Sequence, residues 1–366
     1  MITALSQLIG DYFFNSFASI KLIEQIILGL LQVRDVNLTQ LALTIKGDKQ
    51  ESRYKKLQRF FAKCELSYTS LAKLLVRLAG IDAEQWLLVL DRTNWKFGKL
   101  DINILVLSIC HKGIAIPIMW DMLPKAGTSN NVERQQLMER FITVFGIEKM
   151  SALLGDREFI GDLWLKFLAD KMIPFYIRIK ANLTIGRAED ELVTANHLIK
   201  KLQNGEYMLF KGKRYLGKNY KGPKVSVAAL RNDEGVLVII ATNDNPHVAL
   251  NIYKKRWEIE SLFACLKTRG FNFENTHIIH LDRISKLLGL LAIAFTFAYV
   301  VGQWQNSIKP IKLKKHGRKS ISLFRYGLDY LQRIFLNIEE MMKKWMEVIT
   351  KFIKPIIPSL LRLSPC

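Results

Sequence analysis

Two aspartates in this sequence each follow a continuous apolar run, and a glutamate far along the chain stands in a stretch with helical character. "WLLVLD" ends at Asp91 and "ALLGD" ends at Asp156. Such a run indicates a buried strand that delivers its last side chain to a sheet edge. If Glu260 joined them there, the three carboxylates could bind hard divalent cations, which prefer oxygen ligands. Aspartate after a strand is common, however, so ordinary strand ends remain the alternative.

The stretch around that glutamate, "YKKRWEIESLFACLK" (253–267), predicts a helix with an unusual face. At about 100° per residue, Tyr253, Arg256, Glu260 and Lys267 fall within a stripe roughly 60° wide. A helix normally gives such a stripe to apolar residues that face a core. The pattern fits either a solvated, charged face or a face turned toward a ligand.

The elements that must position these residues are predicted to form an α/β sheet. After "WLLVLD", the runs "INILVLSIC" and "IAIPIMWDM" are joined by a short polar turn, which predicts an antiparallel hairpin. Helical spacing over 132–145 and 162–171 alternates with strands at 152–156 and 174–180. Strands followed by alternating helix and strand predict a mixed sheet covered by helices.

The flanking regions differ in character from this core. Residues 1–84 show helical periodicity, and Lys46 to Lys63 carries seven basic residues against two acids. Residues 182–245 contain short strand-like pieces with many lysines and tyrosines, which predicts a β-rich insertion suited to a nucleic-acid backbone or, alternatively, a sheet edge protected by lysines. Asn245 and Pro246 are expected to start the next helix. The C-terminal region is basic and helical.

The charge balance limits the choice of partner. The chain has 54 Lys and Arg against 33 Asp and Glu, a net charge of +21, which favours nucleic acid or an anionic membrane as partner. The uncharged run Leu287 to Val301 has 15 residues, fewer than the roughly 20 of a membrane-spanning helix, so we expect a buried core helix and no membrane. Four scattered cysteines fit a reducing compartment.

Taken together, these motifs resemble the insertion-sequence-4 family of DDE transposases, whose signature is Tyr-x2-Arg-x3-Glu-x6-Lys. Tyr253, Arg256, Glu260 and Lys267 have that spacing. "LDRTNWKFG" and "GDREFIG" resemble the family's blocks around its first and second aspartates, and the 104-residue gap from Asp156 to Glu260 matches the family's β-strand insertion. The resemblance covers roughly residues 50–305.

The resemblance implies an RNase H-like core, Mg²⁺ as cofactor with Mn²⁺ as a substitute, and cut-and-paste transposition at terminal inverted repeats. Its expected partners are double-stranded DNA, both transposon ends and target, and a second copy of the chain in a homodimer. It also implies a bacterial cytoplasmic location at the nucleoid. Carried over by position, the catalytic and metal-binding residues are Asp91, Asp156 and Glu260. The implied DNA contacts are Tyr253, Arg256, Trp257 and Lys267.

The resulting division of the chain has five parts. Residues 1–84 are expected to bind DNA ends, 85–181 and 246–305 to form the catalytic core, 182–245 to be the insertion, and 306–366 to be a basic helical region that contributes to dimerisation. Some members of the family stack an extruded base on aromatic residues during hairpin formation, and Trp257 could take part in this. The insertion has no Trp between Trp164 and Trp257, and Tyr215 or Tyr220 could substitute for it. Glu158 could support the site or form a surface ion pair. A nuclease without strand transfer and a non-catalytic DNA-binding regulator remain alternatives.

Overall fold

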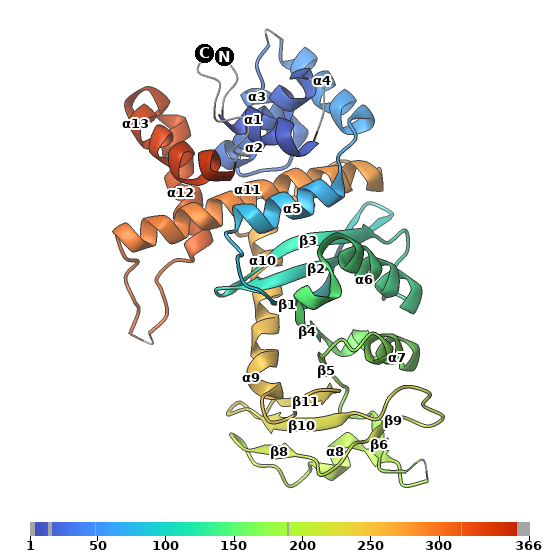
Figure 1. Cartoon of the computed structure of the whole chain (residues 1–366). Coiled ribbons are helices and arrows are strands. Elements are labelled where there is room, and N and C mark those ends of the chain that lie inside the picture. The colour runs from blue at the N-terminus through green and yellow to red at the C-terminus, as the bar shows by residue number, and fades with distance from the viewer. Residues whose placement is uncertain (1–3, 14–16, 48, 189, 316, 357–366) are drawn as a thin grey trace. The chain divides into compact units, whose positions relative to one another are not determined.

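The computed structural model describes residues 4–13, 17–47, 49–188, 190–315 and 317–356, which fall into two compact units (Figure 1). Unit 1 contains Met1–Asp82, Trp95–Ile102 and Leu262–Cys366. Unit 2 contains Ala83–Asn94 and Asn103–Ser261. Each unit is therefore assembled from segments that are distant in the sequence. The functional roles expected for the five parts of the chain stay predictions.

The main sheet has eight strands in the order β3-β2-β1-β4-β5-β11-β10-β8. β1 pairs in parallel with β4, and β4 pairs in parallel with β5, whereas β2 and β3 are antiparallel. This mixed sheet, covered by helices, confirms the predicted α/β, RNase H-like fold class. The strands are β1 (Trp86–Phe97), β2 (Leu100–His111), β3 (Ile114–Met122), β4 (Met150–Gly155), β5 (Phe175–Arg178), β8 (Tyr207–Leu209), β10 (Ser226–Arg231) and β11 (Leu237–Thr242).

Burial explains why the central strands read as apolar runs. Leu88, Val89 and Leu90 of β1 are fully buried, as are Leu154 of β4 and Ile177 of β5. A strand that is covered on both faces needs apolar residues at successive positions, not only at alternate ones. Because the buried part of each strand is apolar, a polar residue directly after that part is conspicuous in the sequence.

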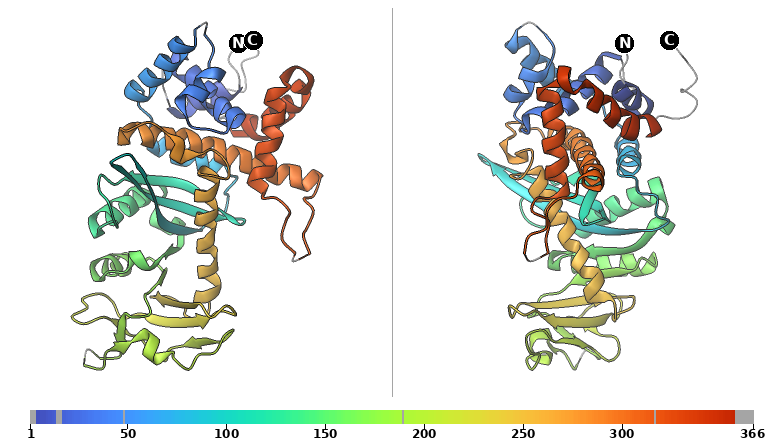
Figure 2. Two further views of the ribbon diagram at one scale, coloured as in Figure 1. Left: turned by 180° about the vertical axis from the view of Figure 1, so that it is seen from behind. Right: turned by 90° about the vertical axis from the view of Figure 1, so that its left-hand side faces the viewer.

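Helices lie on both sides of this sheet, as the views in Figures 1 and 2 show. α6 (Asn131–Phe145) and α7 (Asp162–Asp170) lie on one side, and α9 (Ala249–Tyr253), which contacts β5, β10 and β11, lies on the other. α6 begins with a capping box, because the Asn130 side chain accepts from the Glu133 N–H and Glu133 returns the bond.

The insertion contributes to the main sheet, which the sequence pattern did not predict. Its strands β8, β10 and β11 extend the sheet beyond β5, and β11 pairs antiparallel with β5. The remaining strands, β6 (Thr184–Gly186), β7 (Val193–Thr194) and β9 (Tyr215–Leu216), form a separate small sheet beside the short helix α8 (Ala195–Leu198). A local sequence pattern does not show which distant strands pair, so the pairing of β11 with β5 could not be predicted from it.

The segment that carries the Tyr-Arg-Glu-Lys spacing consists of three helical pieces instead of one helix. α9 ends at Tyr253, a 3₁₀ turn spans Lys254–Arg256, and α10 spans Trp257–Leu266. The expectation that Asn245 caps this helix is wrong. α9 begins at Ala249 after Val248, and the Asn245 side chain instead accepts from the His247 N–H at 3.0 Å, closing a local turn.

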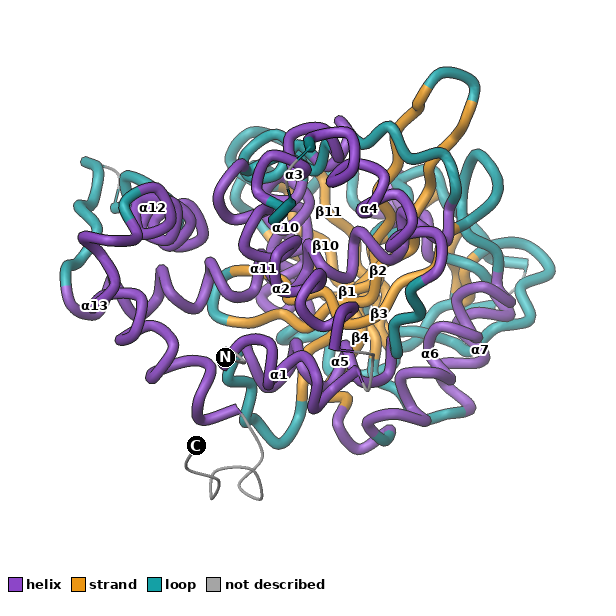
Figure 3. Tube along the Cα trace, turned by 90° about the horizontal axis from the view of Figure 1, so that it is seen from above, coloured by secondary structure: helices purple, strands orange, loops and turns teal. Residues whose placement is uncertain are grey.

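Unit 1 is helical apart from the tip of the β1–β2 hairpin, and Figure 3 shows its helices in purple. The helical character predicted for residues 1–84 holds for the described residues there up to Leu78. The helices are α1 (Ala4–Phe13), α2 (Phe17–Val33), α3 (Leu38–Thr44), α4 (Gln50–Lys63), α5 (Tyr68–Leu78), α11 (Leu281–Ile308), α12 (Leu323–Leu336) and α13 (Ile338–Val348).

α11 is the central helix of unit 1 and packs against α2, α5 and α12. It is long and apolar enough to span a membrane by length and composition, and 89% of its most apolar window is buried within the structure. That burial agrees with the expected core helix. α11 and α12 approach closely at Gly302 and Gly327. Glycine permits this approach, because a Cβ on either residue would overlap the backbone of the other helix.

Candidate active site

Asp91 and Asp156 occupy adjacent positions at neighbouring parallel strands. The last paired residues of β1 and β4 are Leu90 and Gly155, so the two aspartates are the next residues on each strand. The prediction that Asp91 ends its strand is wrong, because β1 continues beyond it to Phe97. β4 does end at Gly155, and the chain then enters a short 3₁₀ turn at Arg157–Phe159. Gly155 permits this tight turn, since a Cβ at that position would lie 3.2 Å from the Cβ of Phe159.

The Asp91 carboxylate is held by two donors in a mostly buried position. Its Oδ1 accepts from the Arg92 N–H at 2.7 Å, and its Oδ2 accepts from Arg256 Nη1 at 3.1 Å. Burial raises the pKa of Asp91 to about 6, an increase that the two donors oppose and the nearby carboxylates Glu158 and Asp156 reinforce. A carboxylate in this environment gains from any additional positive charge.

Asp156 is the least satisfied of the three carboxylates. Its Oδ1 is buried and has no hydrogen-bond partner among the described residues. Buried polar atoms normally have a partner, so an oxygen left in this state suits a cation or a water. Together with the desolvated Asp91 carboxylate, this oxygen fits a hard divalent cation, which binds through oxygen ligands.

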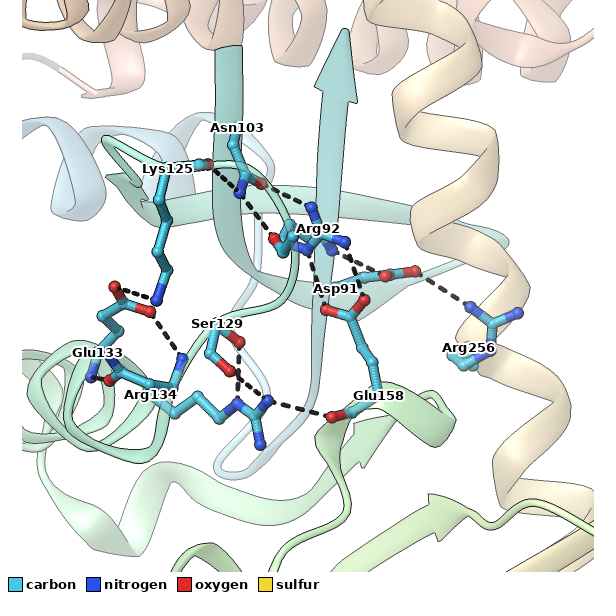
Figure 4. Close-up of polar contacts among 11 residues, drawn as sticks. Asp91, Arg92, Asn103, Lys125, Ser129, Glu133, Arg134, Glu158 and Arg256 are labelled. Atoms are coloured by element: carbon cyan, nitrogen blue, oxygen red, sulfur yellow. Dashed lines mark hydrogen bonds and ion pairs between the residues drawn. The ribbon is translucent and has the colours of Figure 1, made fainter. Parts of the chain in front are cut away.

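Arg256 joins the first and third carboxylates. Its side chain is 7% exposed, and while Nη1 donates to Asp91, Nη2 pairs with Glu260 one turn further along. Its guanidinium also lies 5.8 Å from the ring centre of Tyr253 and 5.6 Å from that of Trp257. Figure 4 shows Arg256 reaching from its helix toward Asp91. A guanidinium thus supplies the positive charge that these carboxylates require.

The structure brings Asp91, Asp156 and Glu260 toward Arg256 but does not arrange them as a ready ligand set. Across the described ranges, no three His, Cys, Asp or Glu side chains form a group that could hold a metal ion. Asp91 and Asp156 each directly follow the last pair of the β1–β4 ladder, whereas Glu260 is connected to Asp91 through the guanidinium. The roles of the three residues therefore stay a prediction, now with a defined geometry.

The four residues predicted to contact DNA lie in different environments. Tyr253 is 6% exposed, its buried hydroxyl has no partner among the described residues, and burial raises its pKa. Trp257 is 63% exposed. Lys267 belongs to unit 1, where its Nζ lies 2.7 Å from Glu274 and 5.5 Å from the ring centre of Trp95. Of these four residues, Arg256 is the one for which the described structure shows hydrogen bonds to predicted catalytic carboxylates.

Sequence reasoning missed three polar residues that surround the aspartates. Arg92 pairs with Glu158, Asn103 accepts from Arg92, and Arg134 donates to the Glu158 carbonyl (Figure 4). Glu158 is therefore part of an ion pair inside the unit, not on its surface, with 21% of its side chain exposed. The sequence feature that could have pointed to Arg92 and Glu158 is the presence of charged residues directly after each aspartate, as in "LDR" and "GDRE".

The tyrosines of the insertion differ in accessibility. Tyr220 is 9% exposed, and its hydroxyl is buried without a partner among the described residues. Tyr215 is half-buried, and the ammonium group of Lys224 lies 4.4 Å from its ring centre. Of these two residues, Tyr215 is the one with a ring that already attracts positive charge.

In unit 1, α4 presents a polar, basic surface with two hollows that share Gln58. The larger hollow, about 550 Å³, is lined by Lys49, Glu51, Ser52, Lys55, Gln58 and Arg59. The smaller, about 220 Å³, lies between α3, α4 and the segment before α11 and includes Tyr54, His277, His280 and Arg283 but no acidic residue. Of the seven basic residues of 46–63, four are exposed on α4, Arg53 is half-buried, and Lys46 and Lys49 are exposed before the helix begins at Gln50. Their role in DNA binding stays a prediction.

Comparison with known proteins adds a family to this geometry. Residues 119–297 match the family model described as "Transposase DDE domain". The matched region includes Asp156 and the segment from Tyr253 to Lys267, and it begins after Asp91. No curated protein matches the chain.

Two solved structures show partial similarity. A piggyBac transposase synaptic complex with hairpin DNA is 11% identical with a TM-score of 0.47, over 96% of this chain and 78% of that one. The catalytic domain of human endonuclease V is 14% identical with a TM-score of 0.30, over 59% of this chain and 94% of that one. The family model matches 179 of the 366 residues, just under half of the chain, and the matched part includes Asp156 and the Tyr-Arg-Glu-Lys segment.

Proposed function

We propose that this chain is an insertion-sequence-4 transposase, which binds the terminal inverted repeats of its element, cleaves the ends and joins them to target DNA. The observation that carries the proposal is the arrangement of carboxylates. Asp91 and Asp156 extend from neighbouring parallel strands, and Arg256 connects Asp91 to Glu260. The match of residues 119–297 to a transposase DDE domain supports the same function.

In this proposal Asp91, Asp156 and Glu260 hold the divalent cation, Mg²⁺ or in its place Mn²⁺. A bound cation would lower the pKa of the attacking water or 3′-hydroxyl and stabilise the leaving oxygen of the phosphodiester. The unpartnered Oδ1 of Asp156 and the desolvated carboxylate of Asp91 are the groups best prepared to receive it.

Arg256 then has two alternative sets of partners. In the structure its guanidinium neutralises Asp91 and Glu260. A guanidinium also binds a phosphate through two parallel hydrogen bonds. We propose that Arg256 releases the carboxylates when a DNA phosphate arrives, so that DNA binding exposes the ligands for the metal. Tyr253, with its free hydroxyl in the described structure, would donate to the same strand.

DNA binding outside the catalytic site is assigned to the basic surface of α4 in unit 1. Its cationic side chains Lys49, Lys55 and Arg59 border one hollow, and Arg283 borders the next. Lysine and arginine that neutralise phosphates release counterions, which makes such binding strongly salt-dependent. Synapsis of two transposon ends further requires a pair of active sites, which we propose a homodimer supplies.

The experiment that tests the function uses the DNA flanking the gene. A labelled duplex carrying one inverted repeat is incubated with protein and Mg²⁺, and a second, precut duplex is offered together with a supercoiled target. Cleavage followed by joining supports a transposase. Cleavage without joining identifies a nuclease, and specific binding without either reaction identifies a regulator. Trapping of a hairpin end would assign second-strand cleavage.

A further inference from the structure

We propose that Arg92 and Glu158 form a positioning pair, which fixes the turn after Asp156 to the strand that carries Asp91 and thereby sets the relation of the two aspartates. This inference rests on the proposed function, because it assigns how the proposed metal-binding carboxylates are held. The sequence left Glu158 open between a residue that supports the site and a surface ion pair, and it did not single out Arg92.

Arg92 makes three directed hydrogen bonds to two different elements. Its Nε and Nη2 donate to the two carboxylate oxygens of Glu158 at 3.1 and 3.2 Å, and its Nη1 donates to Asn103 Oδ1 at 2.8 Å. The forked geometry fixes both distance and orientation, which a single contact does not. With side-chain exposures of 14% and 21%, the pair is sheltered from the solvent that weakens surface ion pairs.

Asn103 extends this arrangement to the loop after β3. The residue is 1% exposed, and its Nδ2 donates to the carbonyl oxygens of Lys125 and Gly127, both at 2.9 Å. The Asn103 side chain therefore accepts one hydrogen bond from Arg92 and donates two to the loop. The Asn103 amide of β2 thus joins the loop to Arg92 of β1 (Figure 4).

Arg134 holds the same turn from the other side. Its Nη2 donates to the Glu158 carbonyl at 3.0 Å and to the Ser129 carbonyl at 2.6 Å, while its Nε donates to Ser129 Oγ at 2.8 Å. Glu158 is consequently fixed through both its side chain and its backbone. Because Arg92 already engages both of its carboxylate oxygens, Glu158 serves as an anchor and not as a further metal ligand.

The position of Asp156 depends on this anchor because its own side chain supplies little restraint. Its Oδ1 has no partner among the described residues, and it makes no side-chain cap to the 3₁₀ turn that follows. The turn is closed by the Phe159 N–H donating to the Asp156 carbonyl at 2.9 Å. Holding Glu158, two residues further on, therefore holds the backbone that aims the Asp156 carboxylate.

The test measures Mn²⁺ affinity of the full-length, DNA-free protein by electron paramagnetic resonance of unbound Mn²⁺. Residues that orient metal ligands typically change affinity by about 10- to 100-fold when mutated. We expect Arg92→Gln and Glu158→Gln to weaken Mn²⁺ binding in that range, Arg92→Lys to weaken it less, and the exchanged pair Arg92→Glu with Glu158→Arg to recover part of the loss. Cleavage by Arg92→Gln should show a lower kcat with an unchanged KM for DNA.

The matched control is Arg140→Gln, because Arg140 pairs with Asp121 at 2.8 Å in the same unit but away from this network. Wild-type Mn²⁺ affinity and kcat in both Arg92→Gln and Glu158→Gln would overturn the positioning role. If Arg92→Gln does not fold, Glu158→Gln, which preserves side-chain size, decides the question alone. The proposed function fails separately if the wild-type protein, in Mg²⁺, neither cleaves nor joins a duplex that carries the element's end.

Discussion

Replacing Asp91 with Asn is expected to stabilise unit 2 in the absence of divalent metal while removing cleavage. The Asp91 carboxylate is desolvated, and its pKa in the folded protein is raised from 3.8 to about 6. A raised carboxyl pKa means that the folded state binds the proton more tightly than the unfolded state. Stability is therefore lost as the pH rises from about 4 through about 6, and an uncharged isostere escapes that loss.

The magnitude follows from the size of this shift. Each pKa unit corresponds to 1.36 kcal/mol, so the ionised Asp91 costs about 3 kcal/mol at pH 7.5 and about 1 kcal/mol at pH 4.5. The substitution also removes one of the two carboxylates that neutralise Arg256 and leaves Glu260 as the other. Because the Asn oxygen can still accept a hydrogen bond from Arg256, the resulting loss of stability is limited. The gain should thus shrink as the pH falls.

Hydrogen exchange in EDTA-containing buffer measures this gain within unit 2. Amides of the fully buried residues Leu88, Val89 and Leu90 should exchange about 150-fold more slowly in Asp91→Asn than in wild type at pH 7.5, and about fivefold more slowly at pH 4.5. Equal exchange rates at pH 7.5, or a difference that does not decrease toward pH 4.5, would refute the assignment of a desolvated carboxylate at this position.

Three further predictions concern the guanidinium, the basic helix and a buried thiol. Arg256→Gln should bind Mn²⁺ at least about tenfold more tightly than wild type in the absence of DNA, because the guanidinium no longer competes for Asp91; unchanged or weaker affinity in a spin-resonance titration would contradict partner exchange. Lys49→Ala and Arg59→Ala should each reduce the salt dependence of log K for duplex binding by about 1, with Lys166→Ala on α7 as the control that leaves it unchanged. Burial raises the pKa of Cys265 to about 12, so this thiol should resist maleimide at pH 8 in the folded protein and react in urea; mass spectrometry that finds rapid labelling without urea would show the site to be open.

The two aspartates could be singled out because their signal is local. The part of a strand that is buried on both faces is apolar along its length, so a carboxylate directly after that part is conspicuous in sequence. The pattern did not show that β1 continues past Asp91 to Phe97. The register of β1 and β4, in which Leu90 lies opposite Gly155, then makes Asp91 and Asp156 neighbours. The expected hairpin of β2 and β3 and the helices α6 and α7 rest on equally local patterns.

The contacts that organise the site could not be predicted in the same way. Arg256 binds Asp91 across 165 residues of sequence, and Arg92 binds Glu158 across 66. Long flexible side chains acquire such partners only when the tertiary structure brings them together. The spacing of residues along the sequence therefore does not predict which side chains will pair. The family resemblance implies that Arg256 contacts phosphate, whereas the structure shows it on carboxylates, and this difference is the reason for proposing that Arg256 changes partners.

The join between the insertion and the main sheet was missed for a related reason. The sequence predicts short strands within residues 182–245, but the strand character of a segment does not specify which sheet edge it will pair with. Thr242 of β11 lies opposite Tyr176 of β5, a pairing that spans 66 residues. The alternation of apolar and polar residues predicts which face of a strand is buried, but it does not predict which strand will pair with it.

The most direct test of the central claim is cleavage of a duplex carrying the element's end by four variants assayed side by side with the wild type in Mg²⁺. The account predicts that Asp91→Ala, Asp156→Ala and Glu260→Ala each bind the duplex but lose nicking by at least about a thousandfold, as expected when a metal ligand is removed. Asp170→Ala, which alters an exposed carboxylate on α7, should cleave like wild type. Wild-type nicking by any one of the three site variants would contradict the assignment of these carboxylates to a single catalytic centre.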